Sequence, residues 1–178
     1  MSSSKPGTER HRTLAAALRY AQSGVHSAEE VRAYLRRRGV ASTAIARIVA
    51  ACREQGSVDD RACARLWAEH WARRGYAGAA IARRLSAKGL DAHTIDVELN
   101  YLARGSPDDA RARLLADSYL RRHSGSPQRE RSLPAPRRAG RLARTLASRG
   151  FDSDVIERVL GESFDSPRAR AGLAQDEC

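Results

Sequence analysis

The fold is decided by one short stretch that the chain carries three times: LRRRGV at residues 35–40, LSAKGL at residues 85–90 and LASRGF at residues 146–151. In every copy an aliphatic residue precedes the leucine by four positions, and an isoleucine follows the glycine by six. Apolar residues four apart share one face of a helix, and glycine favours the left-handed conformation that ends a helix. Self-similarity of this kind is typical of repeat proteins, whose small units bury apolar faces against one another.

Each copy therefore predicts a helix, a glycine stop and a second helix. We expect the leucine to touch the residue after the glycine, as in a Schellman cap. Asp91 and Asp152 are predicted N-caps of the second helices, with Ser42 as a substitute in the first copy. The predicted buried pairs of the first helices are Val31 with Leu35, Ile81 with Leu85, and Leu142 with Leu146.

A third helix is predicted before each of these pairs. Ser57 and Ser106 are each followed by an acidic residue three positions later, which is typical of a helix start. In the first copy this helix is expected at about residues 13–23, and Ser27 with Glu30 forms a predicted capping box for the next one. The side chains expected to face inward are Leu14, Leu18 and Ala21 in the first copy, Leu66, Trp67 and Trp71 in the second, and Leu114, Leu115, Tyr119 and Leu120 in the third.

These patterns predict an all-α protein: three tandem three-helix repeats forming an elongated, curved array. The aromatic content of only 5% fits small aliphatic cores better than one thick core. The expected boundaries are a disordered tail at residues 1–12, repeats at 13–56, 57–105 and 106–163, a Pro/Ser-rich linker at 123–136 within the third repeat, and a second disordered tail at 164–178.

The charge of the chain points to acidic partners. The formal net charge is +11, and all of the 32 basic residues except Lys5 and Lys88 are arginine. Between residues 129 and 150 there are seven arginines and one acid, Glu130. Arginine suits bidentate contact with phosphates and carboxylates. No apolar run approaches the ~20 residues that span a bilayer, and no signal peptide is visible, so we expect a cytoplasmic protein that does not bind membranes.

Residues for catalysis or metal binding are not apparent in the sequence. Cys52, Cys63 and Cys178 lack metal-ligand spacing, and the five histidines are scattered. Two Asp-Asp pairs, at residues 59–60 and 108–109, occupy matching positions, so helix capping explains them better than an acid-base pair. We therefore expect neither an enzyme nor a cofactor.

The chain resembles the RecX family, regulators of the bacterial RecA recombinase. The middle copy carries VDDRA at residues 58–62, RRGY at residues 73–76 and KGLD at residues 88–91, which is similar to the hallmark of that family. The resemblance covers roughly residues 13–162. The chain departs from the family pattern at Ala77, where a glycine is usual, at Cys63, where an aromatic residue is common, and in its Pro-rich insertion.

The resemblance implies a function. Members bind RecA filaments on DNA, lie along the filament groove, and restrain ATP hydrolysis, strand exchange and co-protease activity in DNA repair and the SOS response. We expect this chain to act as a monomer on such a filament, with weak, non-specific contacts to DNA phosphates. The arginines expected to meet the partner are Arg36, Arg37, Arg38, Arg73, Arg74, Arg83, Arg84, Arg137, Arg138, Arg141 and Arg144.

Two other functions remain open at this point. Short helix-turn-helix units on a basic chain also suit an autonomous, non-specific DNA-binding module. However, the helices after the glycine stops carry apolar stripes rather than an obviously polar recognition face. A scaffold of helical repeats for some other protein is the third possibility, and for any one arginine a merely solvated position remains the simpler interpretation.

Overall fold

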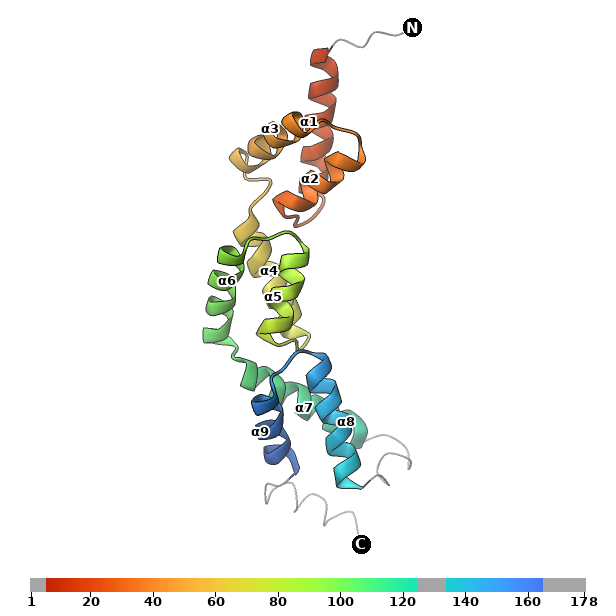
Figure 1. The fold of residues 1–178 in the computed structure, drawn as a ribbon, viewed down its shortest axis with the longest axis vertical. Helices are drawn as coiled ribbons and strands as arrows, with labels where there is room; N and C mark the ends of the chain where they lie inside the picture. The colour runs from red at the N-terminus through yellow and green to blue at the C-terminus, as the bar shows by residue number, and fades with distance from the viewer. Residues whose placement is uncertain (1–5, 125–133, 165–178) are drawn as a thin grey trace. The chain divides into compact units, whose positions relative to one another are not determined.

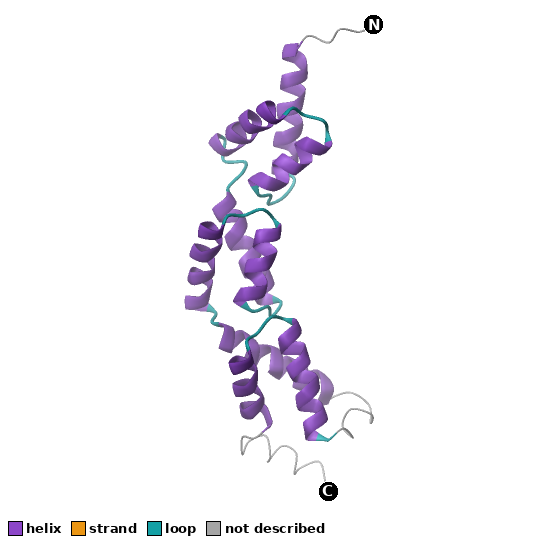
Figure 2. Cartoon of the chain, in the orientation of Figure 1, coloured by secondary structure: helices purple, strands orange, loops and turns teal. Residues whose placement is uncertain are grey.

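A computed structural model describes residues 6–124 and 134–164, and all regular structure within these ranges is α-helix (Figures 1 and 2). None of the helices found there combines the length and the apolar character needed to cross a membrane. The helices of the described ranges are α1 (Pro6–Gln22), α2 (Ala28–Arg37), α3 (Ser42–Glu54), α4 (Asp60–Arg73), α5 (Gly78–Ala87), α6 (Ala92–Gly105), α7 (Asp108–Ser124), α8 (Ala135–Ser148) and α9 (Ser153–Phe164).

The chain divides into two compact units. Unit 1 holds Met1–Trp67 and Arg84–Glu98, and unit 2 holds Ala68–Arg83 and Leu99–Cys178. The division cuts α4, α5 and α6, so each of these helices contributes residues to both units. Helices α1, α2 and α3 pack on one another in unit 1, and α7, α8 and α9 do so in unit 2 (Figure 1).

The outer boundaries differ in part from those expected. Helix α1 begins at Pro6, so the expectation of a disordered tail over residues 1–12 is wrong for residues 6–12. Proline fits the first position of a helix, where its missing amide would have no partner within the helix. Helix α7 continues to Ser124, and α8 begins at Ala135, inside the expected linker; residues 125–133 and 165–178 lie outside the described residues.

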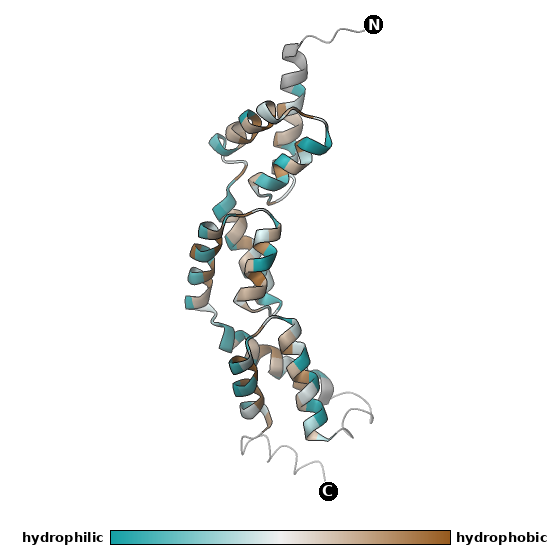
Figure 3. Cartoon of the chain, in the orientation of Figure 1, coloured by the Kyte–Doolittle hydropathy of each residue, from teal (hydrophilic) through white to brown (hydrophobic). Residues whose placement is uncertain are grey.

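The predicted apolar pairs form the cores. The six side chains of the pairs Val31–Leu35, Ile81–Leu85 and Leu142–Leu146 are all 0% exposed. Figure 3 shows apolar and polar positions alternating along the helices, as the helical period requires of helices with one buried face. In unit 1, Val31 and Leu35 pack with Ile45, Val49 and Cys52. In unit 2, Leu142 and Leu146 pack with Phe151 and Val159, while the expected Ile156 is only partly buried against them.

The three glycine stops are confirmed. Gly39, Gly89 and Gly150 have φ values of 72°, 76° and 85°. In each, the amide of the residue after the glycine donates to the leucine carbonyl, for example Val40 to Leu35 at 3.2 Å. Two further glycines, Gly56 and Gly75, end α3 and α4 with φ values of 67° and 74°.

Alanine pairs form the buried part of the inward face of the first helix in each repeat, and the predicted Leu18, Leu115 and Tyr119 pack partly buried against the cores. Leu66 is 46% exposed and Leu114 is 66% exposed, so their predicted inward orientation is wrong. Small side chains let helices approach closely, which places the alanine face toward the core instead. The buried pairs, each four residues apart, are Ala17 with Ala21, Ala64 with Ala68, and Ala112 with Ala116.

One joint in unit 1 holds the amino end of α2 between α4 and α5. Asp59, not the predicted Ser57, caps α4, accepting from the amides of residues 61 and 62. Its neighbour Asp60 reaches α2 and accepts from the Ala28 amide at 2.7 Å. On the other side, the Ser27 hydroxyl donates to the Lys88 carbonyl at 2.6 Å, and the Lys88 ammonium pairs with Glu30 at 2.7 Å.

Unit 2 repeats this joint with α5, α7 and α8. Asp108, the first residue of α7, accepts from the Gly78 amide at 3.1 Å. The carbonyl of Arg149, at the end of α8, accepts from the Ala77 amide at 3.0 Å. Thus both Asp-Asp pairs do contribute helix caps as expected, but Asp60 and Asp108 cap a helix of the preceding repeat.

A salt-bridged seam joins the first and third helices of the second repeat. Glu98 of α6 is buried, and its carboxylate accepts from Arg61 at 2.7 Å and from Arg65 at 2.9 Å, both on α4. These arginines hold the pKa of Glu98 below its ordinary value of 4.5, with the Arg65 hydrogen bond as the largest cause, although burial acts to raise it. The third repeat has a comparable exposed pair, Arg113 with Glu162 at 2.6 Å.

Replacement of the three stop glycines by alanine should destabilise the fold to different extents. At Gly39 a Cβ would meet nothing within 4 Å, so Gly39→Ala should reduce the free energy of unfolding by about 1–2 kcal/mol, the cost of the left-handed backbone. At Gly150 a Cβ would lie 2.7 Å from that of Ala80, and at Gly89 it would overlap Glu29. Overpacking should add about 1–3 kcal/mol at these two sites. Urea unfolding measures the order, and equal losses at all three positions would contradict it.

The buried carboxylate predicts an acid-sensitive contribution to stability. The folded-state pKa of Glu98 is depressed, so its contribution is complete above the ordinary value of 4.5 and is lost as pH falls toward the folded-state value. Glu98→Gln should lower the free energy of unfolding at neutral pH by about 1–2 kcal/mol. The difference in the free energy of unfolding between Glu98→Gln and the native chain should shrink as the pH falls. The exposed Glu54→Gln variant is the control, and a constant difference would contradict the assignment.

Candidate interaction surfaces

The predicted contact arginines of unit 1 gather mainly at one helix end. Arg36, Arg37 and Arg38 are exposed at the carboxyl end of α2, where cations suit the helix dipole. Arg36 pairs with Glu29, and the Arg38 guanidinium lies over the Tyr34 ring, 4.6 Å from its centroid. These contacts orient two of the three cations, whereas Arg84, on α5 in the same unit, is half-buried.

In unit 2 the predicted arginines form a stripe along α8. Arg137, Arg141 and Arg144 are exposed and spaced so that they share the face opposite the buried Leu142 and Leu146. Arg138 is half-buried, 6.0 Å from the centroid of the Phe164 ring. The sequence of α8 contains no acidic residue, so the helix itself supplies no negative charge to this face.

A second basic surface of unit 2 is a hollow of about 510 Å³. Predicted residues Arg73 and Arg74 line it, and Arg73 also pairs with Glu69 at 3.7 Å. Arg122 and Arg149, which were not predicted as contacts, line it as well, and the exposed Leu114 gives it an apolar edge. A hollow with several guanidinium groups and an apolar edge suits a polyanion or an acidic protein segment.

Arg149 and Arg111 position this hollow. Arg149 donates to the Arg74 carbonyl, and its guanidinium lies over the Tyr76 ring, 4.5 Å from the centroid. Arg111 is 4% exposed and donates to the Tyr76 carbonyl at 3.1 Å, to the Ser106 carbonyl and to Asp108. Burial is the largest influence on the pKa of Arg111 and lowers it, while the charge of Asp108 opposes this.

The sequence gives little indication of the roles of Arg149 and Arg111. Arg149 was visible only as a cation in the last turn of a helix, and Arg111 only as one of many arginines. Arg83, the remaining predicted contact, is exposed on α5 and approaches the end of α8: one of its guanidinium nitrogens would lie 3.4 Å from a Cβ at Gly150.

Within the described residues, no three His, Cys, Asp or Glu side chains are placed to hold a metal ion. Cys52 and Cys63 are free, buried thiols. Burial raises the pKa of the Cys63 thiol to about 11, so it supplies almost no thiolate at neutral pH. At the surfaces above, the exposed guanidinium groups can bind anionic partners.

The chain is similar in sequence to proteins of one family. Residues 59–99 match the family profile described as the second three-helix domain of RecX. Regulatory protein RecX of Chlorobaculum tepidum is 32% identical over 151 residues, which cover 82% of this chain and 87% of that one. Regulatory protein RecX of Streptomyces coelicolor is 32% identical over 133 residues, or 74% of this chain, and the match spans 66% of the Streptomyces protein.

Solved structures show the same fold. The crystal structure of RecX from Lactobacillus salivarius has a TM-score of 0.70 at 19% identity, covering 88% of this chain and 97% of that one. A second crystal structure of regulatory protein RecX has a TM-score of 0.66 at 21% identity, covering 84% of this chain and 70% of that one.

We predict that the basic hollow binds the phosphates of single-stranded DNA. Replacing Arg73, Arg74 and Arg122 by glutamine should weaken binding to single-stranded DNA and flatten its salt dependence. The slope of log K against log salt should change by about 0.7 for each phosphate that the variant no longer neutralises. Fluorescence anisotropy at several salt concentrations measures both quantities. The exposed Arg12, Arg19 and Arg104 supply a control triple, and equal slopes for both triples would mean that the hollow binds no phosphate.

Proposed function

The chain belongs to the RecX family of regulatory proteins, and from this premise we propose that it binds RecA filaments on DNA and restrains the recombinase. The activities restrained are ATP hydrolysis, strand exchange and co-protease function, in DNA repair and the SOS response. In this proposal the protein acts in the cytoplasm as a monomer and needs no cofactor.

The arginine stripe of α8 is the single observation that supports this proposal best. Arg137, Arg141 and Arg144 are exposed together on one face of a helix whose sequence contains no acid. Such a concentration of one sign of charge favours an anionic partner electrostatically. A filament that carries DNA offers both phosphates and acidic protein side chains.

Basic surfaces in both units suit a long target with repeated sites. Unit 1 offers the end of α2 with Arg36, Arg37 and Arg38, and unit 2 offers the α8 stripe and the arginine hollow. Tethered surfaces raise one another's effective concentration, so several weak contacts combine into firm binding if they reach the target together. We propose all eleven predicted arginines as contacts on this basis, with Arg122 and Arg149 added from the hollow.

An autonomous DNA-binding module is the second candidate, and the hollow is the observation that favours it. Its guanidinium groups and its exposed Leu114 could contact a nucleic acid without a recombinase. Such binding would depend on salt and little on sequence. A scaffold for another protein is the third candidate, which retention of a different partner in a pull-down would favour.

The direct test is to add the purified protein to RecA, single-stranded DNA and ATP. We expect stoichiometric amounts to slow ATP hydrolysis and strand exchange, because the protein would occupy the filament. Unchanged rates for both reactions would contradict the proposal. Tight binding to naked DNA together with unchanged rates would favour the second candidate.

A charge reversal tests the α8 stripe. The triple variant Arg137→Glu, Arg141→Glu and Arg144→Glu should weaken filament binding by about a hundredfold, since reversed charges remove attraction and add repulsion. Its circular dichroism should be unchanged because the three side chains are exposed. The triple Arg12→Glu, Arg19→Glu and Arg104→Glu changes the net charge equally and is the control; equal weakening would show that only the net charge matters.

A further inference from the structure

The two joints between repeats are built from the same parts. In each, the amino end of a helix fits between a side chain at the start of one helix and the glycine stop of another. The parts in unit 1 are Asp60 and the Lys88–Gly89 stop, which receive α2. The parts in unit 2 are Asp108 and the Arg149–Gly150 stop, which receive α5. The close packing is evident at the glycines, where a Cβ would collide with Glu29 or Ala80.

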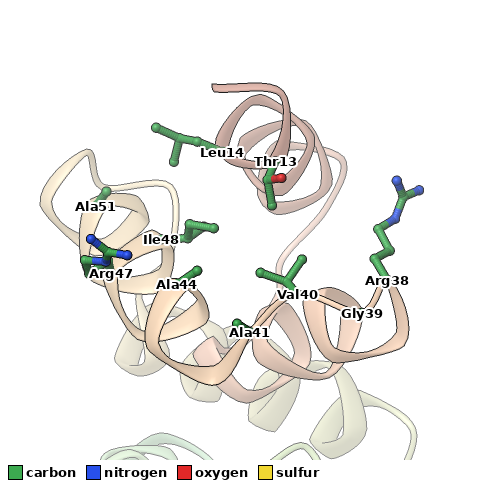
Figure 4. Close-up of a pocket in the computed structure, with 10 residues that line it drawn as sticks. All are labelled: Thr13, Leu14, Arg38, Gly39, Val40, Ala41, Ala44, Arg47, Ile48 and Ala51. Atoms are coloured by element: carbon green, nitrogen blue, oxygen red, sulfur yellow. The ribbon is translucent and has the colours of Figure 1, made fainter. Parts of the chain in front are cut away.

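The first repeat carries a surface at the corresponding position, and no helix of the described ranges fills it. Aligning the buried alanine pairs places Thr13 where Asp60 and Asp108 lie, and Arg38–Gly39 is the matching glycine stop. Thr13, Arg38 and Gly39 line a hollow of about 520 Å³ in unit 1 (Figure 4). A Cβ at Gly39 would meet nothing within 4 Å, in contrast to both occupied joints. We call this surface the socket, and its lining residues are Thr13, Leu14, Arg38, Gly39, Val40, Ala41, Ala44, Arg47, Ile48 and Ala51.

The interior of the socket is apolar where the second repeat has ion pairs. Leu14 of α1 takes the position of Arg61, and Ile48 of α3 takes the position of the buried Glu98. Figure 4 shows Leu14, Ile48 and Val40 projecting toward the hollow, with Ala44 beside them. Exchange of a charged seam for an apolar one suits a surface that buries a partner's side chain.

The charge of the socket selects the occupant. Arg38 and Arg47 line it, and Arg36 and Arg37 are exposed on the adjoining end of α2. In the joint of unit 1, the cation at the stop, Lys88, pairs with Glu30, which lies in the first turn of the received helix. Arg38 stands in the place of Lys88, and no acidic residue is among those that line the socket, so an acidic first turn complements its charge, although α5 is received beside Arg149 without one.

A second copy of this chain does not supply such a helix at its carboxyl-terminal repeat. Val31 and Ile81 are the fourth residues of α2 and α5, whereas Leu142 is the eighth residue of α8. When these residues are aligned, helix α8 therefore begins about one turn earlier than α2 and α5 do. It carries Arg138 and Arg141 where α2 has Ser27 and Glu30. A longer helix with cations at these positions would repel Arg38 and Arg47.

We infer that the socket is a docking site for the amino end of an acidic helix of another protein, with a small residue such as serine or alanine at the cap. Resting on the proposed function, the protein that supplies this helix is a recombinase subunit of the filament. The socket thus repeats between molecules the joint that the chain already uses twice within itself.

The main experiment compares two tryptophan variants on α3. Ala44→Trp places an indole inside the socket, whereas Ala50→Trp places it on the exposed side of the same helix. We expect Ala44→Trp to weaken binding to RecA filaments on single-stranded DNA by about tenfold or more, and Ala50→Trp to change it less than about twofold. Equal affinities for the two variants would overturn the inference while leaving the proposed function intact.

A charge variant covers the case in which Ala44→Trp unfolds the repeat. Arg47→Glu replaces an exposed side chain of the socket, and Arg104→Glu is its control on α6. Arg47→Glu should lower the affinity by about fivefold more than its control does. Sedimentation of the native chain at high concentration is a parallel measurement: a dimer that Ala44→Trp dissolves would show that the socket receives a second copy, and would overturn the inference.

A peptide probe separates failure of the inference from failure of the proposed function. A stapled helical peptide that copies residues 26–37 presents the same amino end that α2 presents in its joint. With a dissociation constant on the order of 1 mM, it should shift the amide resonances of Gly39, Val40 and Ile48 in the labelled native chain. A peptide with Glu30→Lys should bind more weakly. If the native chain did not bind filaments at all, these shifts would still support the socket, and their absence would overturn it.

Discussion

The structure depends on the contact between the amino end of one helix and the glycine stop of another. At Gly89 and Gly150 the chain turns with positive φ and also lies against the helix of the preceding repeat, so no side chain fits on either count. An aspartate on the other side, Asp60 or Asp108, accepts from the amide that the helix leaves without an internal partner. Helix termini thereby become the bonding elements between repeats.

Much of the fold could be predicted because its strongest signals are local. The aliphatic pairs and the glycine stops are properties of a few neighbouring residues, and the structure confirms both. Of the alanine faces only Ala21 was expected, because alanine carries little hydrophobic signal, although the pairs at residues 17 and 21, 64 and 68, and 112 and 116 repeat visibly once aligned. The prediction that Leu66 and Leu114 face inward was wrong because it assumed that large apolar residues are buried, whereas here the close helix packing leaves no room for them.

The candidate surfaces were less predictable, since they depend on tertiary proximity. The stripe of α8 follows from helical spacing alone, so Arg137, Arg141 and Arg144 could be placed on one face in advance. The hollow could not, because Arg149 reaches it through the Arg74 carbonyl and the Tyr76 ring, which come from another part of the sequence. The aspartate pairs were correctly interpreted as caps, but which helix they cap is decided by the packing of repeats.

The middle repeat carries one half of a joint at either end: Asp60 and the Gly89 stop, which receive α2, and the start of α5, which Asp108 and the Gly150 stop receive. The same two halves meet in unit 1 and in unit 2 with different side chains, Ser27 in one and Ala77 in the other. An added repeat, arising by duplication of its coding segment, would therefore bring both complementary ends with it. The number of repeats in such a chain could therefore change by whole repeats without a new kind of joint between them.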